Sequence, residues 1–155
     1  MVMITTAGYI YRNKEVLLGF KKRGFGAGQW TGFGGKVKED EDITACLKRE
    51  IKEESSLDIK DNDIVKCGFV NFEFTDTGSS VDVHVFKIKS SQVEPLESEE
   101  MRPQWFNLDA IPYEAMWDDA KYWLPLVLEG KIVKAHFVYT GKKVMDYKIS
   151  VVEKL

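Results

Sequence analysis

The chain lacks the features that define secreted and membrane-spanning proteins. Only two of its 155 residues are cysteines, Cys46 and Cys67, which is too few for a disulfide framework and suits a reducing compartment such as the cytosol. No apolar run approaches the roughly 20 residues that a membrane-spanning helix needs. The first eleven residues have no basic lead and no long apolar core, so we expect no secretory signal.

A basic surface is also missing. The formal net charge is -3, which argues against non-specific binding to a nucleic-acid polymer. There is no internal repeat, low-complexity tract or linker, and 155 residues suffice for one domain with a substantial core. We therefore expect a single domain over residues 1–155. It should be a cytoplasmic monomer, with a nuclear or mitochondrial fraction left open, and its partner should be a small molecule.

Hydrophobic patterning predicts strands interleaved with helices. The strand-like segments are 2–11, 15–21, 30–33, 64–74, 81–89, 101–106, 132–139 and 144–152. Helices are expected over 42–54 and 120–129, with a short helical segment from Pro112, and Asp118 and Asp119 can cap the helix over 120–129. This mixture indicates an α/β fold in which helices flank a sheet.

The most concentrated chemistry lies on the helix predicted over 42–54. Its apolar stripe consists of Ile43, Leu47 and Ile51. Glu50, Glu53 and Glu54 share one side of the helix, and Glu50 and Glu54 project among the apolar positions. Crowded carboxylates repel one another and lose solvation unless a cation joins them, and hard divalent cations prefer oxygen ligands. Taken alone, however, an acidic helix face is more often simply solvated.

A glycine-rich loop over 21–30, KKRGFGAGQW, precedes this helix. Its three glycines allow a ligand to come close to the backbone, and its three adjacent cations attract phosphate. Such loops are common without a ligand. The loop by itself is therefore weak evidence for a phosphate site.

Written from Gly35, the stretch resembles the Nudix box. It reads Gly, five residues, Glu41, seven residues, then REIKEE over 49–54, one residue, and Ser56-Leu57. Ser56 departs from the pattern, because the family has glycine there. A residue just after a helix often needs a positive φ, so serine should cost about 1 kcal/mol of local stability without touching a ligand.

The resemblance extends along most of the chain to the MutT-like members of this family that hydrolyse oxidised purine nucleoside triphosphates. The matching stretches are LLGFKKRGFGAGQW, GFGGKV, FEF, VDVHVF, ESEEMRPQWF, IPYEAMW and YWLPL. The resemblance implies the Nudix fold, a mixed sheet sandwiched between helices (α/β/α). It also implies hydrolysis of 8-oxo-dGTP and 2-hydroxy-dATP to monophosphate and diphosphate, with magnesium, or manganese in its place, as cofactor.

Site residues follow from the same resemblance. The implied metal ligands are the Gly35 carbonyl, Glu50, Glu53, Glu54 and Glu100. Among these, Glu53 or Glu100 is the candidate base and Glu54 is catalytic as a ligand, while Arg49 holds the glutamates in place. The implied substrate-binding positions are Thr6, Lys21, Phe25, Thr31, Phe72, Phe74, Met101, Trp117 and Asp119.

Several positions depart from the family in the predicted base pocket. Thr31 stands where the family has an asparagine, and Val81 replaces a methionine. Aligned without a gap, Asp119 matches the first of two recognition aspartates and Ala120 the second, although a one-residue slide would pair Asp118 with Asp119. Two alternatives follow. The pocket could instead prefer methylated purine nucleotides, dinucleoside polyphosphates or general triphosphates. Alternatively, the fold could serve as a non-catalytic binding module, which the intact box glutamates disfavour.

Overall fold

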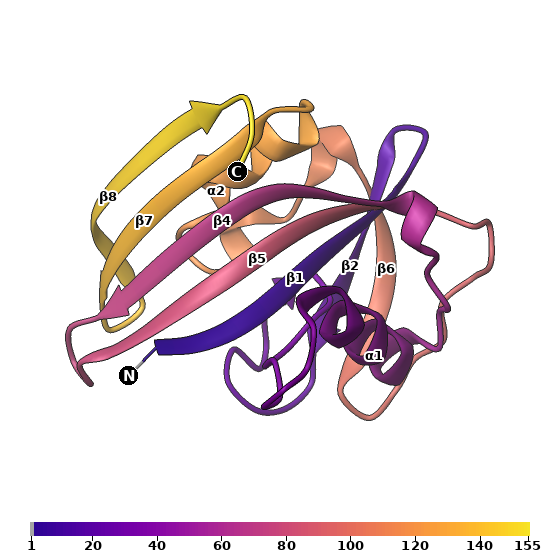
Figure 1. Cartoon of the computed structure of the whole chain (residues 1–155), viewed down its shortest axis with the longest axis horizontal. Helices are drawn as coiled ribbons and strands as arrows, with labels where there is room; N and C mark the ends of the chain where they lie inside the picture. Colours follow the sequence, from indigo (N-terminus) through magenta and orange to yellow (C-terminus); the bar gives the residue numbers. More distant parts are fainter. Residues whose placement is uncertain (1) are drawn as a thin grey trace.

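A twisted sheet runs through the molecule, with one long helix on each side of it (Figure 1). The computed structural model describes residues 2–155. Its strands are β1 (Val2–Arg12), β2 (Glu15–Lys21), β3 (Trp30–Thr31), β4 (Ile64–Phe74), β5 (Ser79–Lys89), β6 (Met101–Asn107), β7 (Ile132–Thr140) and β8 (Lys143–Val152). Its helices are α1 (Ile43–Ser55) and α2 (Ala120–Leu128), with 3-10 turns at Asp61–Asp63, Leu108–Ala110 and Tyr113–Ala115.

The sheet is mixed, as predicted. Its order is β3-β2-β1-β5-β4-β7-β8, and β6 pairs with β2 beside this path. β1 pairs with β5 and β4 with β7 in parallel, whereas the other neighbours are antiparallel. Because side chains alternate along each strand, the sheet presents an apolar set to each helix. The α/β/α arrangement is therefore confirmed.

The two helices bury separate apolar clusters. On α1, Leu47 and Ile51 are fully buried with residues of β1, β2 and β5. On α2, Trp123, Leu124 and Val127 pack with the other cluster, which includes residues of β4 and β7. The periodic stripe expected on the first helix is thus the face that meets the sheet.

The helix starts differ in how they are capped. Asp42 accepts the backbone N–H of Thr44 at 3.2 Å and caps α1. Asp119 occupies the equivalent position before α2 but makes no side-chain cap, so that prediction is wrong. The reason is that buried hydrogen-bond donors inside the protein compete for its carboxylate. Asp118 instead accepts the backbone N–H of Val144 on β8 at 2.9 Å.

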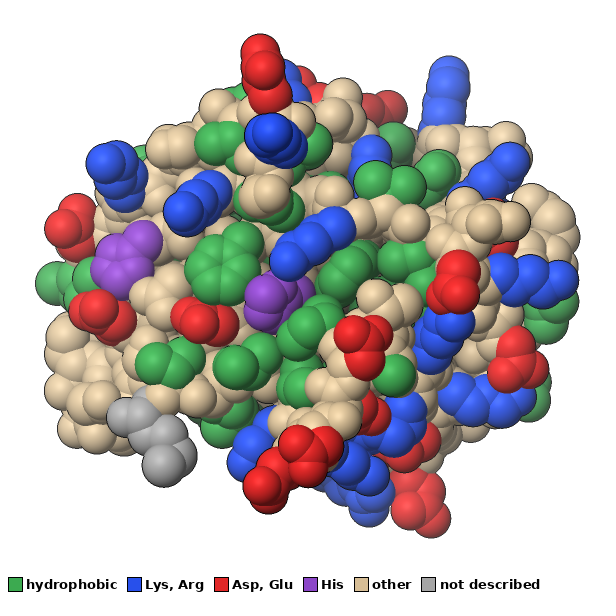
Figure 2. Space-filling view, in the orientation of Figure 1, with side chains coloured by type: hydrophobic (Ala, Val, Ile, Leu, Met, Phe, Trp, Pro, Cys, Tyr) green, Lys and Arg blue, Asp and Glu red, His purple; other side chains and the backbone are tan. Residues whose placement is uncertain are grey.

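The face drawn in Figure 2 carries charges of both signs. Figure 2 shows acidic, basic and hydrophobic side chains interspersed over one face of the molecule. Within residues 2–155, neither helix has the length and apolar character needed to cross a membrane.

Candidate active site

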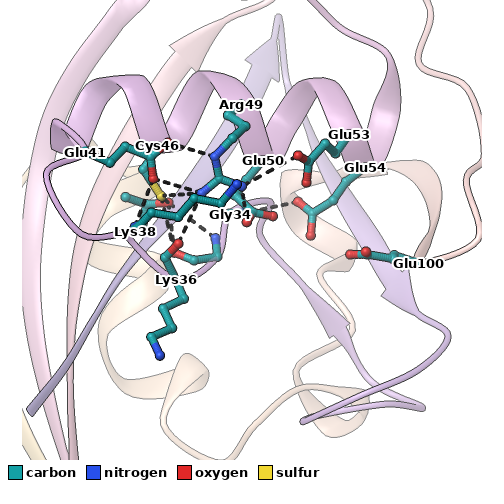
Figure 3. Close-up of polar contacts among 12 residues, drawn as sticks. Gly34, Lys36, Lys38, Glu41, Cys46, Arg49, Glu50, Glu53, Glu54 and Glu100 are labelled. Atoms are coloured by element: carbon teal, nitrogen blue, oxygen red, sulfur yellow. Dashed lines mark hydrogen bonds and ion pairs between the residues drawn. The ribbon is translucent and has the colours of Figure 1, made fainter.

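Three carboxylates converge beside α1 (Figure 3). Glu50 and Glu54 lie one turn apart on the helix, and Glu100 reaches them from the loop just before β6. One oxygen of each lies within 4.8 Å of the others. Carboxylate oxygens at this spacing are the donors that hard divalent cations prefer. The residues present therefore fit such an ion.

Burial makes the charge of Glu54 costly. Its side chain is 3% exposed, and it accepts the backbone N–H of Gly34 at 2.9 Å. Burial, followed by the neighbouring charge of Glu50, raises its pKa to about 9. A bound cation would stabilise the ionised form that burial disfavours. The position of Glu54 among buried side chains is thus an independent argument for a cation site.

Arg49 orients the carboxylate cluster. Its Nη1 donates to Glu50 at 2.8 Å, while Nε and Nη2 donate to the two oxygens of Glu41 at 2.7 and 2.9 Å. Nη2 also donates to the Lys36 carbonyl at 3.2 Å. These bonds lower the pKa of Glu41 to about 2 and raise the pKa of Arg49. The guanidinium thus ties the loop before α1 to the helix and contacts Glu50, and its role in holding the glutamates for catalysis remains a prediction.

Gly35 lies in the loop before α1, beside Glu50. A side-chain carbon at this position would lie 2.5 Å from the carboxyl carbon of Glu50, so a larger residue would displace the Glu50 carboxylate. The Gly35 carbonyl accepts the backbone N–H of Thr6 at 2.9 Å and the thiol of Cys46 at 3.6 Å. This oxygen already has protein donors, and its role as a metal ligand remains a prediction.

Glu53 stands apart from the three converging carboxylates. Its side chain is 51% exposed, and its nearest cation is Arg49, at 3.6 Å from Nη1. The structure therefore brings together Glu50, Glu54 and Glu100, but not Glu53. As a ligand or a base, Glu53 remains a prediction.

A large cleft adjoins the carboxylate cluster. Its volume is about 1220 Å³, and Glu54 is part of its wall. The cleft brings together every position predicted to bind substrate. They are Thr6, Lys21, Phe25, Thr31, Phe72, Phe74, Met101, Trp117 and Asp119.

Aromatic rings form much of the cleft wall. Phe25, which is 70% exposed, stacks on Trp117 with ring centroids 5.0 Å apart, and Phe74 stacks on Tyr139 at 5.4 Å. Gly26 lets the loop pass beside Trp117, because a side-chain carbon there would lie 2.9 Å from the indole nitrogen. Flat apolar walls of this kind suit a planar base.

Buried polar side chains meet at Asp119. Trp123 Nε1 donates to its Oδ2 at 2.7 Å, and the Tyr139 hydroxyl contacts its Oδ1. Burial raises the pKa of Asp119, and these hydrogen bonds act in the opposite direction. Ala120 lines the same cleft, whereas Asp118 does not and binds Val144 instead. The cleft therefore includes Asp119 but not Asp118, and the recognition role of Asp119 remains a prediction.

Sequence reasoning missed Tyr139 and Trp123. Both line the cleft, but both fit the apolar pattern of their elements and read as core residues. A large aromatic with a polar atom at a buried position needs a hydrogen-bond partner, and this was the one available signal.

Comparisons with known proteins agree with this site. The NUDIX domain family model matches residues 1–127. An oxidized purine nucleoside triphosphate hydrolase of Mus musculus is 45% identical over 145 residues, covering 93% of this chain and 92% of the relative. A relative of the same name from Danio rerio is 46% identical over 142 residues, covering 91% and 90%.

The fold has a close structural counterpart. The crystal structure of a MutT protein from Bacillus halodurans superposes with a TM-score of 0.84 at 25% identity, covering 96% of this chain and 97% of that one. One family accounts for the mixed sheet, the box glutamates on a helix and the extended sequence match. This chain belongs to the Nudix family and is a Nudix hydrolase.

Proposed function

We propose that the chain hydrolyses oxidised purine nucleoside triphosphates, of the 8-oxo-dGTP and 2-hydroxy-dATP class, to the monophosphate and diphosphate and so sanitises the nucleotide pool. The observation that carries this proposal is the single cleft that joins the nine predicted substrate positions to Glu54. The mouse and zebrafish relatives, both oxidized purine nucleoside triphosphate hydrolases, support the same substrate class.

Nudix hydrolases generally use divalent metal ions, and we propose Mg²⁺ here, with Mn²⁺ able to substitute. Glu50, Glu54 and Glu100 would hold the ion. When bound, a divalent cation neutralises triphosphate oxygens and lowers the pKa of a water molecule that it binds. Lys21, which also lines the cleft, adds positive charge toward the phosphates.

The protein's own groups position the reactants and accept the proton. Arg49 keeps Glu50 oriented through the hydrogen bond at 2.8 Å. Of the two candidate bases, Glu53 lies outside the carboxylate cluster and is half exposed, so it can accept a proton from attacking water without also serving as a ligand of the cluster. We therefore assign the base to Glu53 and a ligand role to Glu100.

Product analysis with matched variants tests this assignment. With Mg²⁺ present, chromatography of an 8-oxo-dGTP reaction should show monophosphate and diphosphate. Glu53→Gln should lower kcat by about 100-fold or more with unchanged cation affinity, whereas Glu100→Gln should weaken cation binding. Triphosphate cleaved to nucleoside diphosphate and phosphate would contradict the proposed reaction. Full activity of Glu53→Gln would return the base to Glu100.

A second candidate is a Nudix hydrolase that prefers a different substrate, such as methylated purine triphosphates. Ala120 in the cleft favours it, because the second recognition carboxyl is absent. Faster turnover of methylated than of oxidised purine triphosphates would support this candidate. The non-catalytic binding module is disfavoured by the three converging carboxylates.

The cellular compartment and the oligomeric state complete the proposal. We propose a cytoplasmic compartment, because Cys46 and Cys67 are both free and buried thiols, and we propose that the protein is a monomer. A single peak near 17.8 kDa in light scattering would support the monomer, and a dimer mass would contradict it.

A further inference from the structure

The carboxylate of Asp119 is surrounded by hydrogen-bond donors from the protein itself. Trp123 Nε1–H, which can only donate, contacts Oδ2, and the Tyr139 hydroxyl contacts Oδ1. The same hydroxyl accepts the backbone N–H of Asp119 at 2.9 Å. Asp119 is 5% exposed and Tyr139 1%, so bulk water does not compete for these bonds.

The proton of the Tyr139 hydroxyl decides the form of Asp119. Within residues 2–155, the acceptor in hydrogen-bonding distance of this proton is Asp119 Oδ1. An ionised Asp119 accepts it. A protonated Asp119 that donated to Tyr139 would leave the tyrosine proton buried without a partner. The loss of this hydrogen bond would lower the population of that form by roughly tenfold to hundredfold.

We propose that Tyr139 is a specificity-determining residue whose hydroxyl keeps Asp119 in its hydrogen-bond-accepting form, so that the cleft selects purines with an N–H donor at ring position N1, as guanine-type bases have. This inference rests on the proposed function and narrows it. Neither Tyr139 nor its hydroxyl belongs to the predicted set of substrate-binding positions.

The orientation of a bound nucleotide follows from the fold. The carboxylate cluster lies beside α1 and Asp119 lies at the start of α2, and these helices are on opposite sides of the sheet (Figure 1). A triphosphate held at the cluster directs the sugar-bearing nitrogen of the purine toward α1. The edge farthest from the sugar, which belongs to the six-membered ring, then reaches Asp119.

The two purine types differ at ring position N1, which is a donor in guanine-type bases and an acceptor in adenine-type bases. Each oxygen of Asp119 accepts one protein donor and keeps one lone pair free. A guanine-type base offers its ring N1–H and 2-amino group as donors to these lone pairs. An adenine-type base offers its 6-amino group as one donor, but it presents an acceptor at N1, and Ala120 supplies no second carboxyl to donate to it. A second hydrogen bond to an adenine-type base therefore requires a proton on Asp119 directed at N1. Tyr139 opposes this protonation, because its hydroxyl donates more strongly to the ionised carboxylate than to the neutral acid.

Two substrates that differ only at this edge provide the test. 8-oxo-dGTP and 8-oxo-dATP share the oxidised five-membered ring, and the wild type should prefer 8-oxo-dGTP in kcat/KM by about tenfold or more. Tyr139→Phe keeps the ring that stacks on Phe74 but removes the hydroxyl. The preference should then fall by about fivefold or more, chiefly because kcat/KM for 8-oxo-dATP rises.

Tyr122→Phe is the matched control. It removes a hydroxyl from α2 outside the cleft, where Tyr122 stacks on Tyr147. The control should retain the wild-type preference. An equal loss for both substrates in Tyr139→Phe, or a preference unchanged from wild type, would overturn the inference and leave the proposed function standing. If the wild type hydrolysed neither substrate, the proposed function would fail and the inference with it.

A second measurement on the wild type does not depend on the variant folding. The specificity ratio, which is the kcat/KM for 8-oxo-dATP divided by that for 8-oxo-dGTP, should rise as pH falls, because Asp119 must gain a proton. The titratable groups around Asp119 are Tyr9 from β1, Tyr139 from β7 and the neighbouring Asp118. Taking the ratio cancels titration at the carboxylate cluster, which both substrates share. A ratio that is flat with pH would contradict the proposal.

Discussion

At the scale of single residues, Glu54 carries the strongest conflict between charge and burial in the carboxylate cluster. It lies on the side of α1 that meets the rest of the protein, yet a cation site requires it to be ionised. Burial and the nearby charge of Glu50 raise its pKa from 4.5 to about 9. Without a cation, folding therefore works against the charged form.

This conflict predicts a pH dependence of stability in the metal-free protein. Between pH 4.5 and about 9 the unfolded chain has lost the Glu54 proton while the folded chain keeps it, so stability falls as pH rises through this window. Glu54→Gln cannot ionise. It should be more stable than wild type at pH 7 by up to about 3 kcal/mol, with a flatter pH profile.

Denaturant unfolding in the presence of a chelator measures this difference. Glu53→Gln is the control, because it makes the same change at the neighbouring, half-exposed position. Added Mg²⁺ should stabilise wild type more than Glu54→Gln. Identical pH profiles for wild type and Glu54→Gln would show that Glu54 is not the group that titrates.

At the scale of elements, α1 shows how local sequence determines a site. The apolar spacing predicts the helix to within a residue at each end, and Asp42 caps it as such patterns require. The same periodicity places Glu50 and Glu54 on successive turns. It could not show that Arg49 would engage Glu41 and Glu50 at once, because that depends on the path of the preceding loop.

The end of α1 gives a second prediction. Ser56 has φ of 65°, in the left-handed region, so the conformation expected from its departure from the Nudix box is confirmed. Ser56→Gly should raise stability by about 1 kcal/mol and the Tm by about 2–4 °C. Ser55→Gly, one residue earlier inside the helix, should instead lower the Tm. A Ser56→Gly variant that melts no higher than wild type would refute the strain at this position.

At the scale of the whole molecule, the cleft depends on strands that are distant in sequence. Tyr139 lies 20 residues from Asp119, and the parallel register of β4 and β7 places it beside Phe74. Periodicity predicts both strands, but it predicts neither their register with each other nor the position of the loop before α2 beside them. The family resemblance supplied the nine substrate positions, whereas the Tyr139–Asp119 contact required the folded chain.

The most direct measurement is steady-state hydrolysis of 8-oxo-dGTP and unmodified dGTP with Mg²⁺, compared by kcat/KM. The proposed function predicts that 8-oxo-dGTP leads by about 100-fold or more, which corresponds to about 2.7 kcal/mol of transition-state discrimination. Equal rates for the two nucleotides would contradict the proposal that this cleft selects oxidised purines.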